Sequence, residues 1–125
     1  DEVLKCEVLK MMLQPIVENA LIHGIEPLEH PGVISIKIYK EEKNIKFKVT
    51  DNGVGMSKEQ VEQLLKDNHN NKRSRFSGIG IKNVNERIKL FYGRQYGLKI
   101  YSELGLYTTV EFEIPMLKKE VGKGA

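Results

Sequence analysis

The sequence predicts a single layered α+β domain, a two-layer sandwich of helices and sheet. Apolar residues recur with helical spacing over residues 13–24 and again over 81–91, which indicates helices with one buried face. Apolar residues alternate with polar ones over residues 34–49 and 98–114, as in strands with one buried face. With 125 residues, the chain is long enough for one hydrophobic core and too short for a second domain.

The composition excludes several classes of protein. Apolar residues make up 40% of the chain and charged residues 30%, which is ordinary for a soluble domain. No apolar run approaches the ~20 residues of a membrane helix, and a net charge of +3 is too small to indicate nucleic-acid binding. The single cysteine, Cys6, rules out an internal disulfide and fits the cytoplasm. We assign the domain to residues 1–117 and expect a disordered tail over 118–125.

The first predicted helix has a polar face as well as an apolar one. Residues 1–12 lack a clean period, so we expect a lead-in that turns helical near residue 10. The expected core face consists of Leu13, Ile16, Val17, Ala20, Leu21 and Gly24, with Gly24 closing the helix. Half a turn round, Glu18, Asn19 and His23 share the other face. Two interpretations of this polar face are open: it faces water on an amphipathic helix, or it forms one wall of a functional site.

A carboxylate follows a strand in phase with its buried face. Strands are predicted at residues 34–38 and 45–49, joined as a β-hairpin. The alternation of the second strand places Asp51 on the buried side, where an unpaired charge costs roughly several kcal/mol, so Asp51 needs a partner. The run Asp51-Asn52-Gly53-Val54-Gly55 fits a tight turn alone, because its residue types are turn formers, and it also fits the edge of a site.

The middle of the chain predicts a short helix and then a lid. Ser57 and Gln60 form a capping-box pattern for a helix that ends near Lys66. Residues 67–77 contain one large apolar residue among polar ones and cannot bury enough surface to hold themselves in place, so we expect a mobile lid. The basic residues in and after it are Lys72, Arg73, Arg75, Lys82 and Arg87. Such a cluster suits a phosphate chain and equally a solvated loop.

Two glycines open the last predicted helix. Gly78-Ile79-Gly80 leaves free backbone N–H groups without side chains to block approach, which makes an anion site. The residues expected to face the core are Ile81, Val84, Ile88 and Phe91, and Gly93 ends the helix. Strands follow at residues 98–102 and 107–114. Thr108 begins the apolar face of the second strand, so Thr108 and Asp51 are two polar groups placed to meet over one ligand.

Three motifs occur in order, each on its expected element. They are Glu18-Asn19-Ala20 with His23-Gly24, Asp51-x-Gly53-x-Gly55, and Gly78-x-Gly80-x-x-Asn83-Val84. Together they resemble the ATP-binding domain of sensor histidine kinases, in the superfamily that includes gyrase, Hsp90 and MutL. The resemblance covers nearly the whole chain, and Gln14-Pro15 with the run from Asn83 to Gly93 is similar to the branch typified by LytS and YesM. It implies a Bergerat fold, a mixed, mostly antiparallel sheet with helices on one face and a lid over the nucleotide.

The resemblance also implies roles for single residues. The cofactor-binding residues that it implies are Asn19, Asp51, Gly53, Gly55, Arg73, Arg75, Gly78, Gly80 and Thr108. Asn19 corresponds to the asparagine that binds Mg²⁺. Asp51 corresponds to the aspartate that accepts a hydrogen bond from the adenine amino group, where guanine offers a carbonyl. Glu18 and His23 are the implied catalytic groups, one orienting water or a proton and the other lying near the phosphates.

Four features depart from the family pattern. Tyr107 stands where the family has the second glycine of Gly-x-Gly-Thr, which puts the contact of Thr108 in question, and Pro15 replaces a polar residue. A strand that normally precedes residues 1–12 is absent, so an edge of the sheet is expected to be exposed or paired with another molecule. No histidine of the chain has the surroundings of the family's phosphoacceptor, which lies N-terminal to this domain.

The resemblance therefore implies the catalytic domain of a two-component sensor histidine kinase, with ATP and Mg²⁺ as cofactors. The expected partners are the dimerisation and phosphoacceptor segment of a homodimeric full-length protein and a downstream response regulator. We expect that protein to be anchored in the bacterial membrane, with this domain in the cytoplasm and touching no membrane. Two alternatives stay open: a serine kinase of the anti-sigma-factor type, which carries a similar Asn-Ala-x-x-His-Gly helix, and a module that senses ATP without transferring phosphate.

Overall fold

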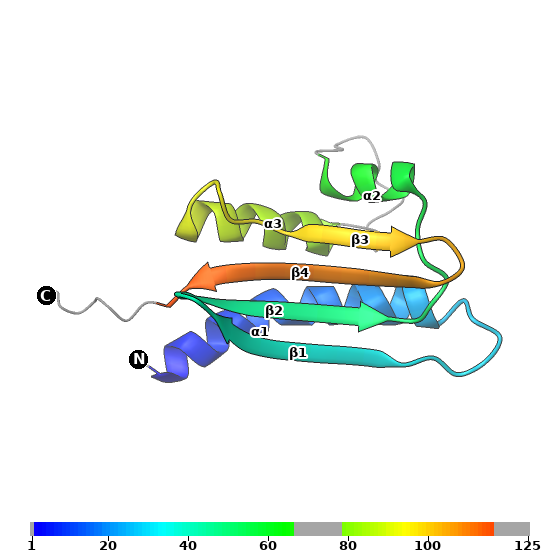
Figure 1. Ribbon diagram of the computed structural model, residues 1–125, viewed down its shortest axis with the longest axis horizontal. Helices are drawn as coiled ribbons and strands as arrows, with labels where there is room; N and C mark the ends of the chain where they lie inside the picture. The colour runs from blue at the N-terminus through cyan, green and yellow to red at the C-terminus, as the bar shows by residue number, and fades with distance from the viewer. Residues whose placement is uncertain (1, 67–78, 117–125) are drawn as a thin grey trace, which may run out of the picture.

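The computed structural model describes residues 2–66 and 79–116. Its elements are α1 (Glu2–Asn19), the π-helical segment η1 (Ala20–Ile25), β1 (Ile34–Glu41), β2 (Asn44–Asp51), α2 (Lys58–Leu65), α3 (Ile79–Tyr92), β3 (Lys99–Glu103) and β4 (Tyr107–Pro115). The strands form one sheet, and α1 and α3 lie side by side on one of its faces (Figure 1). The predicted two-layer α+β sandwich is confirmed. The expected lid and tail lie outside the described residues.

The four strands are arranged in the order β1-β2-β4-β3, and every neighbouring pair is antiparallel. The parallel pairing of a mixed sheet therefore does not occur among these strands. Phe47 lies opposite Phe112, and their rings stack with centroids 4.6 Å apart. Because directly opposite residues share a face, the predicted apolar faces of β2 and β4 coincide.

The core lies between the sheet and the helices. Its buried members are Met12, Ile16, Phe47, Val49, Ile81, Val84, Ile88, Leu98, Val110, Phe112 and Ile114. Burying one such large side chain stabilises the fold by about 1.5–3 kcal/mol. The prediction for Phe91 is wrong, because this side chain is 59% exposed. Tyr92, the next residue and the last of α3, packs against the core instead.

Helix α1 begins at Glu2, so the expectation of a lead-in up to residue 10 is wrong. The stretch before Pro15 contains neither glycine nor proline and is rich in Leu, Lys, Glu and Met, which favour a helix without needing a clean apolar period. The helix also continues past Gly24 as η1, where the Glu26 N–H donates to the Leu21 carbonyl at 2.9 Å. Gly24 is therefore not a left-handed helix cap.

The π-helical turn changes which side chains face the core. Ile16, Ala20 and Gly24 are buried as predicted, whereas Leu21 is 46% exposed. The wider turn of η1 takes the residues after Asn19 out of the 3.6-residue phase on which the prediction depended. Leu21 consequently leaves the buried stripe.

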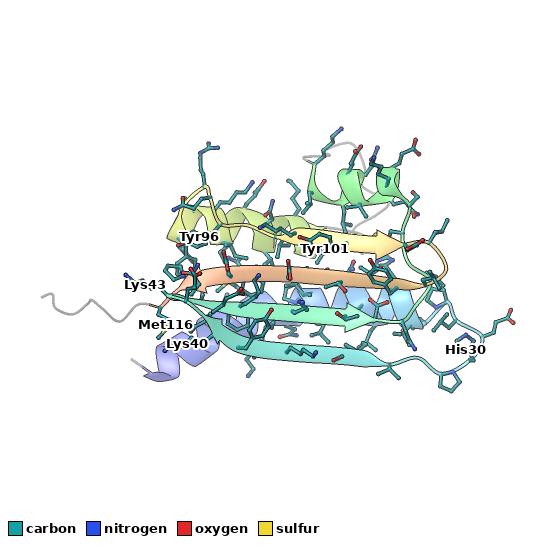
Figure 2. The ribbon with its side chains drawn as sticks, viewed as in Figure 1. His30, Lys40, Lys43, Tyr96, Tyr101 and Met116 are labelled. Atoms are coloured by element: carbon teal, nitrogen blue, oxygen red, sulfur yellow. The ribbon has the colours of Figure 1, made fainter. Side chains whose placement is uncertain are left out.

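Strand β1 forms one edge of the described sheet. Ile36 and Ile38 lie opposite the buried Val49 and Phe47, yet they are 49% and 55% exposed. The helix layer therefore ends before this edge. The face of the sheet turned away from the helices is polar, and Tyr101 of β3 lies on it (Figure 2). Within the described part of the chain, no helix is both long and apolar enough to cross a membrane.

The start of α2 and the end of α3 follow the predicted local rules. At the start of α2, the Gln60 N–H donates to the Ser57 hydroxyl at 3.2 Å and the Ser57 N–H donates to the Gln60 side chain at 2.8 Å. This confirms the capping box. Gly93 follows α3 with φ +125°, and its N–H donates to the Lys89 carbonyl at 2.9 Å. Glycine is favoured there because other residues rarely adopt a positive φ.

Asn85 joins α3 to the start of β3 and provides a test of this packing. Its buried side-chain oxygen accepts a hydrogen bond from the Leu98 N–H at 2.8 Å. Replacing it by alanine leaves a buried donor unpaired, so we expect Asn85→Ala to lower the free energy of unfolding by about 1–3 kcal/mol. Urea unfolding followed by circular dichroism measures this. Asn83→Ala, at an exposed position of the same helix, is the control, and equal losses in the two variants would contradict the assignment.

Candidate functional site

A row of three polar side chains crosses the sheet at one end. Asp51, the last residue of β2, lies opposite Thr108 of β4, and Thr108 lies opposite Ser102 of β3. Asp51 is 3% exposed and Thr108 is 5% exposed. The register thus brings together Asp51 and Thr108, as the sequence predicted, on the face of the sheet that carries the core.

The Asp51 carboxylate is buried with a neutral partner. Its Oδ1 accepts a hydrogen bond from the Gly53 N–H at 2.8 Å, and within the described residues it forms no ion pair. Burial raises the pKa of Asp51 above its usual value, and the Gly53 hydrogen bond offsets this only in part. Most of the lone pairs of the carboxylate remain available to a ligand that offers hydrogen-bond donors.

Gly24 gives Asp51 its place beside the helix layer. A Cβ atom at residue 24 would lie 2.6 Å from Asp51 Oδ1, closer than any real contact. A Cβ atom at residue 53 would clash with the Gly24 carbonyl, which accepts a hydrogen bond from the Val54 N–H at 3.0 Å. Gly24 and Gly53 therefore allow η1 and the turn after β2 to touch, backbone to backbone.

Gly55 allows a second close approach on the other side of the turn. It has φ +73°, and a Cβ atom there would clash with the Glu103 carbonyl at the end of β3. The Gly105 N–H donates to the Val54 carbonyl at 2.6 Å. The segment from residue 53 to 55 is thus held between η1 and the β3–β4 turn. Gly53 and Gly55 therefore each have a steric role in the fold, and this role does not depend on a ligand.

The polar face of the first helix leads into η1, which touches the row at Gly24. Asn19 is the last residue of α1 and is half-buried, as is His23 on η1. Glu18 is exposed, and its carboxylate accepts a hydrogen bond from the Gln14 side chain at 3.1 Å. Asn19 and Glu18 lie at the end of α1 where the α-helix passes into the π-helical turn, close in sequence to the buried Gly24.

The start of α3 rests on α1 one turn before Asn19. A Cβ atom at Gly80 would lie 3.1 Å from the Cβ of Pro15, so Gly80 allows the two helices to approach here. Pro15 has thus a packing role inside α1. The N-terminal end of α3 and Asn19 are brought to the same side of the helix layer. The other implied nucleotide ligands, Arg73, Arg75 and Gly78, lie outside the described residues.

The described residues contain no group of three or more His, Cys, Asp or Glu side chains that would hold a metal ion. A cation at this site would therefore take few ligands from these side chains. Asn19 offers one amide oxygen, a ligand type that suits Mg²⁺, which keeps several waters and binds substrate phosphates. The residues present fit a magnesium ion that arrives with a phosphate chain.

Sequence reasoning missed two residues of the site. Gly24 was interpreted as a helix terminus, and its contact with Asp51 depends on a tertiary approach that no local pattern encodes. Ser102 received no role, although its hydroxyl contacts Met56, Tyr107 and Thr108. A polar residue in phase with Ile100 on an otherwise apolar strand face was the available signal for Ser102, and it resembles the signal that identified Asp51.

Comparison with protein families matches residues 6–118 to the family described as histidine kinase-, DNA gyrase B- and HSP90-like ATPases. The chain is 36% identical over 115 residues to the sensor histidine kinase YesM of Bacillus subtilis and 32% identical over 125 residues to the sensor histidine kinase YpdA of Escherichia coli. It is 34% identical over 123 residues to the sensor protein LytS of Bacillus cereus. These matches cover 92%, 100% and 98% of this chain but 18%, 21% and 20% of the relatives. The chain thus spans about a fifth of their length.

Among solved structures, the fold is similar to a histidine kinase domain from a blue-light activated histidine kinase of Erythrobacter litoralis. The TM-score is 0.64 with 16% sequence identity, and the match covers 86% of this chain and 43% of that chain. At this identity the similarity shows the shared fold alone. It agrees with the fold class predicted from the sequence.

The buried Asp51 charge leads to a prediction for the nucleotide-free domain. Because the folded-state pKa of Asp51 is raised, the folded state binds this proton more tightly than the unfolded state does. Stability from this group is therefore present below the unfolded pKa and is lost as the pH rises through the folded pKa. We expect Asp51→Asn, which removes the charge, to raise the midpoint of thermal unfolding at pH 7, by less as the pH falls toward 4.

Thermal unfolding between pH 4 and pH 8 without nucleotide checks this expectation. The control is Glu29→Gln, which removes an exposed carboxylate from the loop before β1. A variant at residue 51 that is less stable than the wild type at pH 7, or whose gain does not depend on pH, would contradict the account of a buried, poorly compensated charge.

Proposed function

Because the chain belongs to the ATP-binding family of histidine kinase-, DNA gyrase B- and HSP90-like ATPases, we propose that it is the catalytic domain of a two-component sensor histidine kinase. In this role it binds Mg-ATP and transfers the terminal phosphoryl group to a histidine outside residues 1–125. The relatives YesM and YpdA are named as sensor histidine kinases, which supports this assignment. The chain matches about a fifth of the length of these relatives, and the role of the whole protein is part of this proposal.

One observation carries the proposal: Asp51 is a buried carboxylate with no charged partner among the described residues, in line with Thr108. Its remaining lone pairs can accept hydrogen bonds from a ligand that offers donors. The 6-amino group of adenine offers such donors, whereas guanine has a carbonyl oxygen at that position. We propose that Asp51 accepts a hydrogen bond from the adenine amino group and that Gly53 and Gly55 line the base beside it.

Magnesium is the second cofactor that we propose, with Asn19 as its ligand from the protein. When bound, the ion neutralises part of the triphosphate charge as the phosphoryl group is transferred. In this proposal Asn19, the last residue of α1, contributes a neutral amide oxygen to the ion. Gly80 lets the N-terminal end of α3 pack close to the same helix, where its backbone N–H groups bind the phosphates.

The remaining residues of the proposed site act on the phosphate end of the nucleotide. We propose that His23 lies near the phosphates and that Glu18, exposed at the end of α1, orients water or a proton. Gly78 with Arg73 and Arg75 completes the phosphate contacts in this proposal, and all three lie outside the described residues. Transfer then depends mainly on positioning and charge neutralisation, since this domain supplies no nucleophile.

The proposed partners follow from the proposal that the acceptor histidine lies outside residues 1–125. The acceptor histidine belongs to a dimerisation segment elsewhere in a homodimeric protein, and a response regulator takes the phosphoryl group from it. We propose that the full-length protein is anchored in the bacterial membrane, with this domain on the cytoplasmic side.

The adenine contact predicts a selective loss of affinity. Asp51→Asn turns one carboxylate oxygen into an NH₂ donor facing the amino donor of adenine, so ATP affinity should fall by ~2 kcal/mol or more. The wild type should also prefer ATP to GTP. Isothermal titration calorimetry measures both, with Glu29→Gln as the control for a lost surface charge. Equal ATP affinity in the wild type and the Asp51 variant would rule out the contact.

The proposed reaction predicts that this chain binds ATP and that the acceptor histidine lies on a different segment. With radiolabelled ATP, the chain alone should label itself negligibly and should phosphorylate a separate fragment that carries the acceptor histidine. Asn19→Ala should abolish this transfer, because losing the ion leaves the triphosphate charge uncompensated. Asn44→Ala, an amide at the far end of β2, is the matched control. Robust acid-labile labelling of the isolated chain that disappears on replacing His23 would overturn the assignment of the acceptor to another segment.

A further inference from the structure

The Ser102 hydroxyl lies where three segments of the site meet. Its Oγ receives a hydrogen bond from the Met56 N–H at 2.8 Å, just before α2. The same oxygen lies 2.7 Å from the Tyr107 carbonyl oxygen and 2.7 Å from Thr108 Oγ1, both on β4. Ser102 is thus in direct contact with the hydroxyl of Thr108, the residue opposite Asp51 in the register.

Counting hydrogens determines the direction of each bond. A serine hydroxyl has one hydrogen and two lone pairs. The Tyr107 carbonyl can only accept, so the Ser102 hydrogen points to it, and the Met56 N–H occupies one lone pair. The second lone pair then accepts the hydrogen of Thr108. In the opposite arrangement two oxygens would face each other at 2.7 Å without a hydrogen between them, which is repulsive.

This arrangement commits the only hydroxyl hydrogen of Thr108 to Ser102. Toward its other neighbours, Thr108 therefore offers lone pairs alone. Asp51, opposite it in the register and likewise buried, offers carboxylate lone pairs. Two acceptor residues consequently occupy opposed positions of β2 and β4 on one face of the sheet, and neither side chain offers a hydrogen to the other.

We infer that Ser102 is a positioning residue for nucleotide selectivity, because it holds Thr108 as a hydrogen-bond acceptor next to Asp51. This inference rests on the proposed binding of adenine nucleotides at Asp51. A purine with a 6-amino group presents donors to the pair of acceptors, either directly or through a water. A purine with a 6-oxo group presents lone pairs to them and is rejected, since no hydroxyl of the pair can turn to donate.

Removing Ser102 should relax this selectivity. In Ser102→Ala, the Thr108 hydroxyl is free to rotate and to donate to a 6-oxo group. We expect ATP to bind about tenfold more weakly and the preference for ATP over inosine triphosphate to fall by about tenfold. Inosine triphosphate has a 6-oxo group in place of the 6-amino group of ATP and also carries a hydrogen on N1. Ser102→Thr keeps the hydroxyl, and a pocket of about 380 Å³ between α2 and β3 beside Ser102 has room for its methyl group. This variant should restore the preference.

Two further variants separate a positioning role from a structural one. Thr109→Val removes a hydroxyl one residue along β4, on the opposite face, where it pairs with the Thr50 hydroxyl at 2.9 Å. It should leave the preference between the two nucleotides at the wild-type value. Thr108→Val should lose the preference to the same extent as the double variant Ser102→Ala/Thr108→Val, because Ser102 acts through Thr108.

Calorimetric titration of each variant with ATP and inosine triphosphate, together with its thermal unfolding midpoint, decides the question. A Ser102→Ala domain that unfolds at a lower temperature but keeps the wild-type preference overturns the inference, since the serine is then structural only. The inference is also overturned if Ser102→Ala changes the preference as much in the Thr108→Val background as it does in the wild-type background. A wild-type domain that binds neither nucleotide refutes the proposed function and this inference together, which distinguishes that outcome from failure of the inference alone.

Discussion

The buried carboxylate of Asp51 is the constraint on which the site depends. It is 3% exposed, and within the described part of the chain its hydrogen bond comes from the Gly53 N–H rather than from a cation. Burial raises the pKa of this carboxyl and makes its charged form costly to the domain without nucleotide. The carboxylate keeps acceptor capacity that a donor from a ligand can satisfy.

Close backbone approaches on both sides of the turn after β2 follow from this constraint. Gly24 leaves room for the carboxylate on the helix side, and Gly53 and Gly55 let the turn contact η1 and the end of β3. A side chain at Gly24 or Gly53 would push η1 away from the end of β2, and a side chain at Gly55 would push the turn away from the end of β3. The glycines therefore act first on the packing of the protein, and the shape of the site results from that packing.

Much of the architecture was predictable because it depends on local rules. The capping box at Ser57, the cap at Gly93 and the apolar alternation of β2 and β4 each involve residues a few positions apart. Two of the errors share a cause. The predictions for Leu21 and Phe91 extend a 3.6-residue period, which fails where the helix widens into η1 and at the end of α3, where Tyr92 packs against the core instead of Phe91.

Patterns in the sequence alone predict the layered α+β class, the polar face at Asn19 and His23, and the position of Asp51 in phase with a buried strand face. These depend on periodicity and on motif order, which the linear chain carries. The three-dimensional fold is needed to see that Gly24 packs on Asp51 and that Ser102 completes the row with Thr108. Those contacts join residues 27 positions apart or lie across a strand register, and they arise from how the layers and strands dock, which no local pattern specifies.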